Sequence, residues 1–70
     1  MKAKRKNFSP LILKKKRIQA GLTQDYMSKK LGFKTSAPYC KIENGKQRAT
    51  AEMLSQIALE LHCAIDDLYC

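Results

Sequence analysis

Lysine and arginine, the side chains that neutralise phosphate, are confined to one part of this 70-residue chain. All 14 lie between Lys2 and Arg48, where only two acids accompany them, so this part carries a net charge of +12. From Ala49 to Cys70 there are four acids and no lysine or arginine, which gives −4. A cationic surface of this kind attracts polyanions. The segregation of charge therefore favours a nucleic acid, or an anionic membrane surface, as the partner of the first part.

The sequence offers little for catalysis or metal binding. Cys40, Cys63 and Cys70 are odd in number and lack the paired spacing of a zinc site, so they indicate neither a disulfide framework nor a metal. His62 is the one histidine, and it lies in the acidic part without a nucleophile arrangement near it. We expect a binding module and not an enzyme, with no metal, no cofactor and no small-molecule ligand.

The apolar runs and the start of the chain predict a cytoplasmic protein. No run approaches the ~20 apolar residues that span a bilayer. The basic start, Met1 to Asn7, is followed by an apolar stretch, Leu11 to Leu13, that is too short for a secretory signal. Binding on a membrane surface would need an apolar helix face free to insert, and the apolar faces here are needed for a core. We therefore expect no membrane partner.

Capping residues and glycines divide the chain into a tail and a set of helices. Residues 1–8 predict a flexible basic tail, because they have four cations and no periodicity, and residues 9–70 predict one domain. Ser9 followed by Pro10 is typical of a helix start, and Gly21 of a helix end. The same signals predict helices over residues 10–20, 24–31, 36–44, 51–61 and 65–69, with Thr23, Thr35 or Ser36, and Thr50 as further caps and Gly32 and Gly45 as further ends. No strand-like alternation is present, so we expect a compact all-α fold of five helices.

Apolar residues at helical spacing predict which faces form the core. In the first helix we expect Leu13, Ile18 and Ala20 on the inner side, with the lysines at 14–16 in solvent. The other positions expected inside are Tyr39, Ile42, Met53, Leu54, Ile57, Ala58 and Leu61. This assignment leaves one side of the third helix free.

Two linked signatures, Gly21-Leu22-Thr23-Gln24 and Ile42-Glu43-Asn44-Gly45-Lys46, stand on either side of Leu31-Gly32-Phe33. With these segments at this spacing, the stretch from Pro10 to Leu68 resembles the Cro/C1-type helix-turn-helix family, which is lambdoid phage repressor-like and also called XRE. The resemblance implies a lambda-repressor-like DNA-binding domain in which the second and third helices form the helix-turn-helix. It implies a sequence-specific, repressor-like transcriptional regulator that inserts the third helix into the major groove of double-stranded DNA.

The resemblance also implies which residues contact DNA. The base-reading positions are Ser36, Ala37 and Lys41, where Lys41 can donate to guanine and Ala37 can contact a thymine methyl group. The phosphate-binding positions are Arg17, Thr23, Gln24, Asn44, Lys46 and Arg48. The chain departs from the family pattern at Ala37 itself, at Lys34, which lengthens the turn by one residue, and at Pro38. DNA shape is therefore a second source of specificity.

Three structural expectations accompany this assignment. Arg17 and Glu43 are implied to form a pair that orients the third helix, although two unrelated surface charges would contribute little. Related small regulators pair through the last helix, which predicts a homodimer on two half-sites. Its contact residues are predicted to be Ile65, Leu68 and Tyr69. The tail cations Lys2, Lys4, Arg5 and Lys6 predict either an arm along the DNA or a solubilising tail.

Two other functions stay open at this point. An antitoxin-type protein-interaction module would have the same helix-turn-helix fold but would bind DNA weakly and without sequence preference. A factor for double-stranded RNA or the ribosome would not use the third helix in this way, because the deep, narrow major groove of RNA does not admit it. Competition between duplex DNA and duplex RNA separates these functions.

Overall fold

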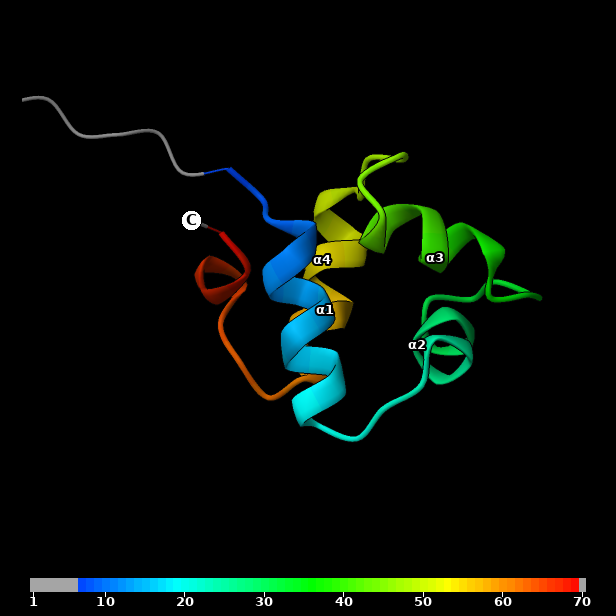
Figure 1. Ribbon diagram of the computed structural model, residues 1–70, viewed down its shortest axis with the longest axis horizontal. Coiled ribbons are helices and arrows are strands. Elements are labelled where there is room, and N and C mark those ends of the chain that lie inside the picture. Colours follow the sequence, from blue (N-terminus) through cyan, green and yellow to red (C-terminus); the bar gives the residue numbers. More distant parts are fainter. Residues whose placement is uncertain (1–6, 70) are drawn as a thin grey trace, which may run out of the picture.

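The structure is a computed structural model that describes residues 7–69 (Figure 1). Four α-helices follow one another in the chain: α1 (Pro10–Gln19), α2 (Gln24–Lys30), α3 (Ala37–Glu43) and α4 (Ala51–Glu60). A turn of 3-10 helix, η1 (Ile65–Leu68), follows α4. In Figure 1, α1 lies in front of α4, with α2 and α3 on the right and η1 on the left. The predicted all-α class is confirmed, and no helix of the described part has the length and apolar character needed to cross a membrane.

The last element lies where the fifth helix is expected, over residues 65–69, and it is a single 3-10 turn. Ala64 and Tyr69 on either side of η1 both have extended backbone, with ψ of 155° and 157°. The amide of Asp67 donates to the carbonyl of Ala64 at 3.0 Å, and the Asp67 carboxylate accepts from the amide of Ala64 at 3.1 Å. The first of these bonds has the three-residue spacing of a 3-10 turn, and the segment is too short to continue as an α-helix. The described fold therefore has four α-helices and one 3-10 turn, and the expected count of five helices is not confirmed.

Three of the four α-helices begin with the predicted cap. Ser9, Thr23 and Thr50 each accept a hydrogen bond from the amide three residues ahead, at 3.3, 3.0 and 3.1 Å. A cap of this kind contributes about 1 kcal/mol to helix stability. The exception is α3, where Ser36 occupies the cap position but its hydroxyl caps no amide. Pro38 lies in the first turn of α3 and has no amide hydrogen, so one fewer backbone donor there needs a hydrogen-bond acceptor. The missing cap therefore costs α3 less stability.

The end of α4 places a side chain where the backbone favours glycine. His62 has a φ of 55°, and it is the one non-glycine residue of the described part with positive φ. The amide of Cys63 donates to the carbonyl of Ala58 at 3.0 Å, a bond that closes the helix around this left-handed residue. A Cβ atom in this conformation is sterically unfavourable, whereas glycine adopts it freely.

We expect His62→Gly to raise the free energy of unfolding by about 0.5–1 kcal/mol, because it removes this steric cost. Thermal unfolding followed by circular dichroism measures the change as a rise of several degrees in Tm, at about 4–8 °C per kcal/mol for a domain of this size. His62→Ala is the matched control, since it removes the imidazole and keeps the Cβ atom. Equal melting temperatures for the two variants would contradict the assignment of strain to His62.

One apolar cluster lies between the helices. It contains Leu13 of α1, Met27 of α2 and Leu68 of η1, each fully buried. Its remaining members are the predicted inward residues Tyr39, Ile42, Leu54, Ile57, Ala58 and Leu61, with Met53 partly buried against them. The expectation for α1 is partly wrong, because Ile18 is 58% exposed and Ala20 is exposed as well. Arg17 takes the inner position one turn after Leu13. The buried side of α1 is therefore formed by Leu13 and Arg17, and Ile18 lies outside it.

Phe8 belongs to the folded body, whereas the sequence assigned residues 1–8 to the tail. Phe8 and Tyr69 form an antiparallel bridge, and their rings meet edge to face with centroids 6.2 Å apart. The amide of Ser9 donates to the carbonyl of Leu68 at 2.8 Å. An aromatic ring that packs on the core is stabilised by the apolar surface it buries. The sequence did not indicate this packing, because the residues before Phe8 are mostly basic. The tail cations Lys2, Lys4, Arg5 and Lys6 lie outside the described residues.

Candidate nucleic-acid interface

The third helix has one exposed side. Ala37, Lys41 and Asn44 are exposed, and their spacing of four and three residues places them along one line of the helix. Ser36 and Cys40 are half-buried at the edges of this line. In Figure 1, α3 lies at the upper right of the body, and no other element of the described part is drawn beyond its outer side. Two of the predicted base-reading residues therefore share an open face, and the third stands at its start.

The turn between α2 and α3 is held by hydrogen bonds to the buried Ser28. Ser28 is fully buried, and its hydroxyl donates to the carbonyl of Thr35. The amide of Phe33 donates to the carbonyl of Ser28 at 3.0 Å, and Gly32 between them has a φ of 89° that a larger residue would adopt only under strain. A small residue at 28 allows the two helices to approach closely. Lys34, the additional residue of this turn, is exposed.

Arg17 links three segments of the helix-turn-helix. Its Nε and Nη2 donate to the two carboxylate oxygens of Glu43 in α3, the second at 3.3 Å. Its Nη1 donates to the carbonyl of Leu22, in the loop before α2, at 2.7 Å. The side-chain amide of Gln24 also donates to Glu43, at 3.0 Å. Arg17 and Glu43 are 9% and 5% exposed, so the ion pair is nearly removed from solvent and can fix the position of α3.

The environment of Glu43 favours its charged form. Burial alone acts to raise the pKa of Glu43, but the hydrogen bonds from Arg17 and Gln24 outweigh it and hold the pKa below the ordinary value of 4.5. The same carboxylate raises the pKa of Arg17 above its usual range, mainly through its hydrogen bond to the guanidinium. Tyr39 lies beside the pair, and its pKa is raised first by burial and then by the negative charge of Glu43. The Tyr39 hydroxyl is buried and has no hydrogen-bond partner among the described residues.

Because the pKa of Glu43 is lowered in the folded state, its charge stabilises the fold at and above the ordinary carboxyl pKa. This contribution is lost as the pH falls below 4.5 and through the lower folded-state pKa. We expect the free energy of unfolding from urea titrations to fall more steeply in this range for the native chain than for Glu43→Gln, which has no charge to lose. If the free energy of unfolding depends on pH in the same way for the two proteins between pH 6 and about pH 3, the lowered pKa assigned to Glu43 is contradicted.

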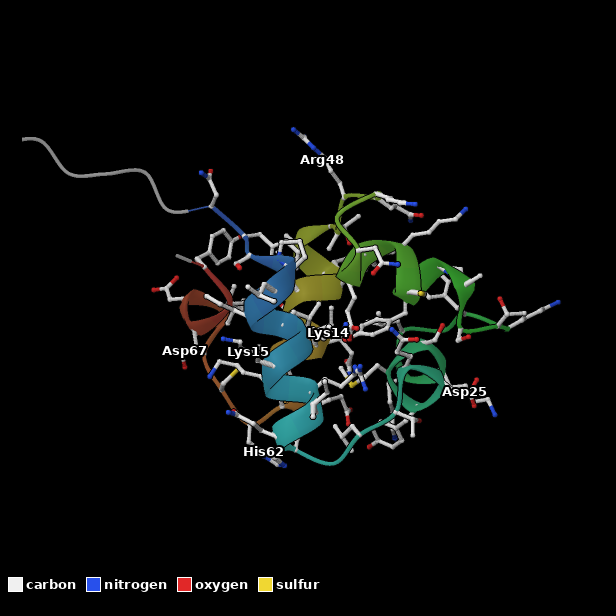
Figure 2. The ribbon with its side chains drawn as sticks, in the orientation of Figure 1. Lys14, Lys15, Asp25, Arg48, His62 and Asp67 are labelled. Atoms are coloured by element: carbon white, nitrogen blue, oxygen red, sulfur yellow. The ribbon has the colours of Figure 1, made fainter. Side chains whose placement is uncertain are left out.

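Five of the six predicted phosphate-binding residues fall into two groups on either side of α3, whereas the sixth, Arg17, is buried with its donors engaged by Glu43 and the Leu22 carbonyl. The first group is at the start of α2, where Thr23 is exposed and Gln24 is half-buried by its bond to Glu43. The second group is the segment after α3, in which Asn44, Lys46 and Arg48 are all exposed. Figure 2 shows Arg48 projecting from the top of the molecule. The two groups can therefore contact phosphates on both borders of a DNA groove while α3 lies between them.

The second group is held to α3 by the backbone. The amide of Lys46 donates to the carbonyl of Lys41 at 2.9 Å, and Gly45 adopts a φ of 75° between them. The side-chain amide of Asn44 donates to the Cys40 sulfur at 3.5 Å. Within residues 7–69, neither Lys41, Lys46 nor Arg48 is paired with an acid. These three cations are thus available to an anionic partner.

The residues predicted for dimer contact do not share one environment. Leu68 is fully buried in the core of its own chain, so its side chain is not available to a second copy, and that part of the prediction is wrong. Tyr69 is half-buried against Phe8, and Ile65 is 39% exposed. A dimer contact at this end of the molecule would therefore depend on Ile65 and its neighbours and not on Leu68.

A link between α2 and α4 was not foreseen from the sequence. The Tyr26 hydroxyl donates to the Glu60 carboxylate at 2.8 Å, which raises the pKa of Tyr26, and Lys30 Nζ lies 5.4 Å from the centre of the Tyr26 ring. Gln56 in turn donates to Glu60 at 2.9 Å. Residues 34 positions apart in different helices give no periodic signal, so only the three-dimensional structure brings them together.

Comparison with known proteins agrees with this arrangement. A family model described as helix-turn-helix matches residues 13–68, which run from α1 to the end of η1 and contain α3 and both groups of predicted phosphate contacts. No curated protein and no solved structure gives a match. The family match covers far more than half of the chain. The chain therefore belongs to the Cro/C1-type helix-turn-helix family, also called XRE, and is a DNA-binding helix-turn-helix regulator.

Proposed function

We propose that the protein is a sequence-specific, repressor-like transcriptional regulator that inserts α3 into the major groove of double-stranded DNA. The observation that carries this proposal is the exposed line of Ala37, Lys41 and Asn44, with unpaired cations on the segment that follows it. An α-helix fits the width of the major groove, and base edges are read there by the side chains on its outer face.

The roles divide between reading bases and holding phosphates. Lys41 donates to the O6 or N7 atom of guanine, Ser36 bonds to a base edge at the start of α3, and Ala37 contacts a thymine methyl group. Lys46 and Arg48 neutralise phosphates without reading sequence. Asn44, Thr23 and Gln24 complete the phosphate contacts on the two borders. Arg17 acts chiefly by positioning, since Glu43 and the Leu22 carbonyl already engage three of its donors.

Selection from a random pool of DNA duplexes tests this function. Repeated rounds at moderate salt should enrich one short site, and unlabelled duplex of that site should compete far better than random duplex DNA or duplex RNA. A reporter gene with the site placed across its promoter should then be expressed less when the protein is present. Failure to enrich any sequence would contradict the proposal and would favour an antitoxin-type protein-interaction module.

A further inference from the structure

The hydroxyl of Tyr39 is the one buried side-chain polar group of the described part that has no hydrogen-bond partner. Tyr39 is fully buried in the apolar cluster and lies in α3, one helical turn before Glu43. A buried phenol whose O–H is unbonded has lost the hydrogen bonds that it makes in water, which destabilises the fold. Buried polar groups in proteins are nearly always paired, so this hydroxyl needs an acceptor.

The carboxylate of Glu43 has a position left for it. A carboxylate can accept about four hydrogen bonds, two at each oxygen. Its Oε1 accepts from Gln24 at 3.0 Å and from Arg17 Nη2 at 3.3 Å. Within residues 7–69, its Oε2 accepts from Arg17 Nε only. Because Tyr39 and Glu43 are four residues apart in one helix, their side chains lie on the same side of α3.

The electrostatic environment of the two side chains agrees with a hydrogen bond between them. Burial acts to raise the pKa of Glu43, and hydrogen bonds from Arg17, Gln24 and Tyr39 act to lower it. The pKa of Tyr39 is raised first by burial and then by a hydrogen bond to Glu43. At neutral pH the pair therefore consists of a protonated phenol, which can donate, and a carboxylate, which can accept.

We propose that the Tyr39 hydroxyl donates to the free acceptor position of Glu43, and that Tyr39 is thereby a positioning residue for α3. The hydroxyl hydrogen rotates about its C–O bond, so it can point to the acceptor that is present. Glu43 is then held from three helices, by Arg17 of α1, Gln24 of α2 and Tyr39 of α3 itself. The sequence placed Tyr39 in the core for its ring, and the inference gives its hydroxyl a separate role. It deepens the proposed function, and rests on it for its effect on DNA binding.

Tyr39→Phe tests the bond, because it removes the hydroxyl and keeps the ring. Tm should fall by about 5–15 °C, since a hydrogen bond to a charged group is lost. A hydroxyl without a partner predicts the opposite sign, because phenylalanine would remove a buried unpaired group, so a rise in Tm would overturn the inference. Tyr69→Phe is the matched control: it removes the same group from a half-buried ring after η1 and should leave Tm nearly unchanged.

The same change in a Glu43→Gln background shows whether the loss comes from this pair. A neutral acceptor forms a hydrogen bond about half as strong, so Tyr39→Phe should lower the urea midpoint at most about half as much there as in the native chain. Packing lost with the hydroxyl would be the same in both backgrounds. Equal losses would therefore overturn the inference.

NMR titration of the chain with ¹³C-labelled glutamate gives a readout that packing alone does not move. In Tyr39→Phe the pKa of Glu43 should rise toward its ordinary value of 4.5, because one of the groups that favour the carboxylate is gone. In Tyr69→Phe it should stay as in the native chain. The same pKa of Glu43 in Tyr39→Phe and in the native chain would overturn the inference.

DNA binding separates this inference from the proposed function. In fluorescence anisotropy, Tyr39→Phe should bind the selected site more weakly and random duplex about as well as before, because a less firmly held α3 affects base reading more than phosphate binding. An unchanged preference for the selected site would overturn the positioning role. If no duplex sequence is enriched, the proposed function is overturned, and the melting, urea and NMR results decide on the hydrogen bond by themselves.

Discussion

Glu43→Ala is expected to lower the free energy of unfolding by about 3–5 kcal/mol, because it leaves the Arg17 guanidinium buried without its counter-charge. The loss also removes the partner of the Gln24 side chain. A domain of this length has a total stability of only about 4–10 kcal/mol, so the variant should be partly unfolded at 37 °C. Urea titration followed by circular dichroism measures the change directly, and Tm should fall by about 15–30 °C.

Two controls separate this effect from a general sensitivity to mutation. Glu52→Ala removes an exposed glutamate and should change stability by less than about 0.5 kcal/mol. The double variant Arg17→Met with Glu43→Leu replaces the ion pair by apolar groups and should recover much of the stability lost in Glu43→Ala. If Glu43→Ala unfolds at the same urea concentration as the native chain, the pair does not hold α3 in place.

Lys41→Ala is expected to reduce the preference for the selected DNA site over random duplex by about 1–3 kcal/mol, which is roughly 5- to 150-fold in the ratio of dissociation constants. The side chain is exposed on the outer face of α3, so its removal should leave Tm unchanged. Fluorescence anisotropy with the selected site and with random duplex measures both constants, and the loss of preference should be concentrated at one guanine of the site.

Lys46→Ala is the matched variant, because it removes the same cationic group from the segment after α3. It should weaken binding to both duplexes alike and reduce the dependence of affinity on salt by about one phosphate contact. Equal effects of Lys41→Ala and Lys46→Ala on the selected and the random duplex would contradict the division between base reading and phosphate binding.

Most of the fold could be predicted from local features of the sequence. Ser9, Thr23 and Thr50 were recognisable as caps because a hydroxyl before an amphipathic stretch satisfies an amide that the helix itself cannot. Tyr39 and Ile42 were recognisable as core because their spacing places them on one side of a helix. These features depend on residues within about one helical turn of each other, and for that reason the sequence displays them.

The features that could not be predicted depend on contacts between distant segments. The bond from Gln24 to Glu43 and that from Tyr26 to Glu60 join residues of different helices, and no pattern in the chain marks them. Ile18 was placed inside because it is apolar, although Arg17 occupies that position once its charge is neutralised by Glu43. Phe8 was placed in a tail because its neighbours are charged, although its partner is Tyr69 at the other end of the described chain.

The way in which α3 is held has a consequence for how such a protein changes its target over evolutionary time. Arg17, Glu43 and Ser28 secure the helix and its preceding turn from the inner side, and none of them belongs to the outer line of Ala37, Lys41 and Asn44. Mutations along that outer line are therefore nearly neutral for folding, so they accumulate without a stabilising change elsewhere. After gene duplication, we expect two copies of this chain to diverge in the DNA that they bind through a few substitutions, while Arg17, Glu43 and Ser28 stay the same.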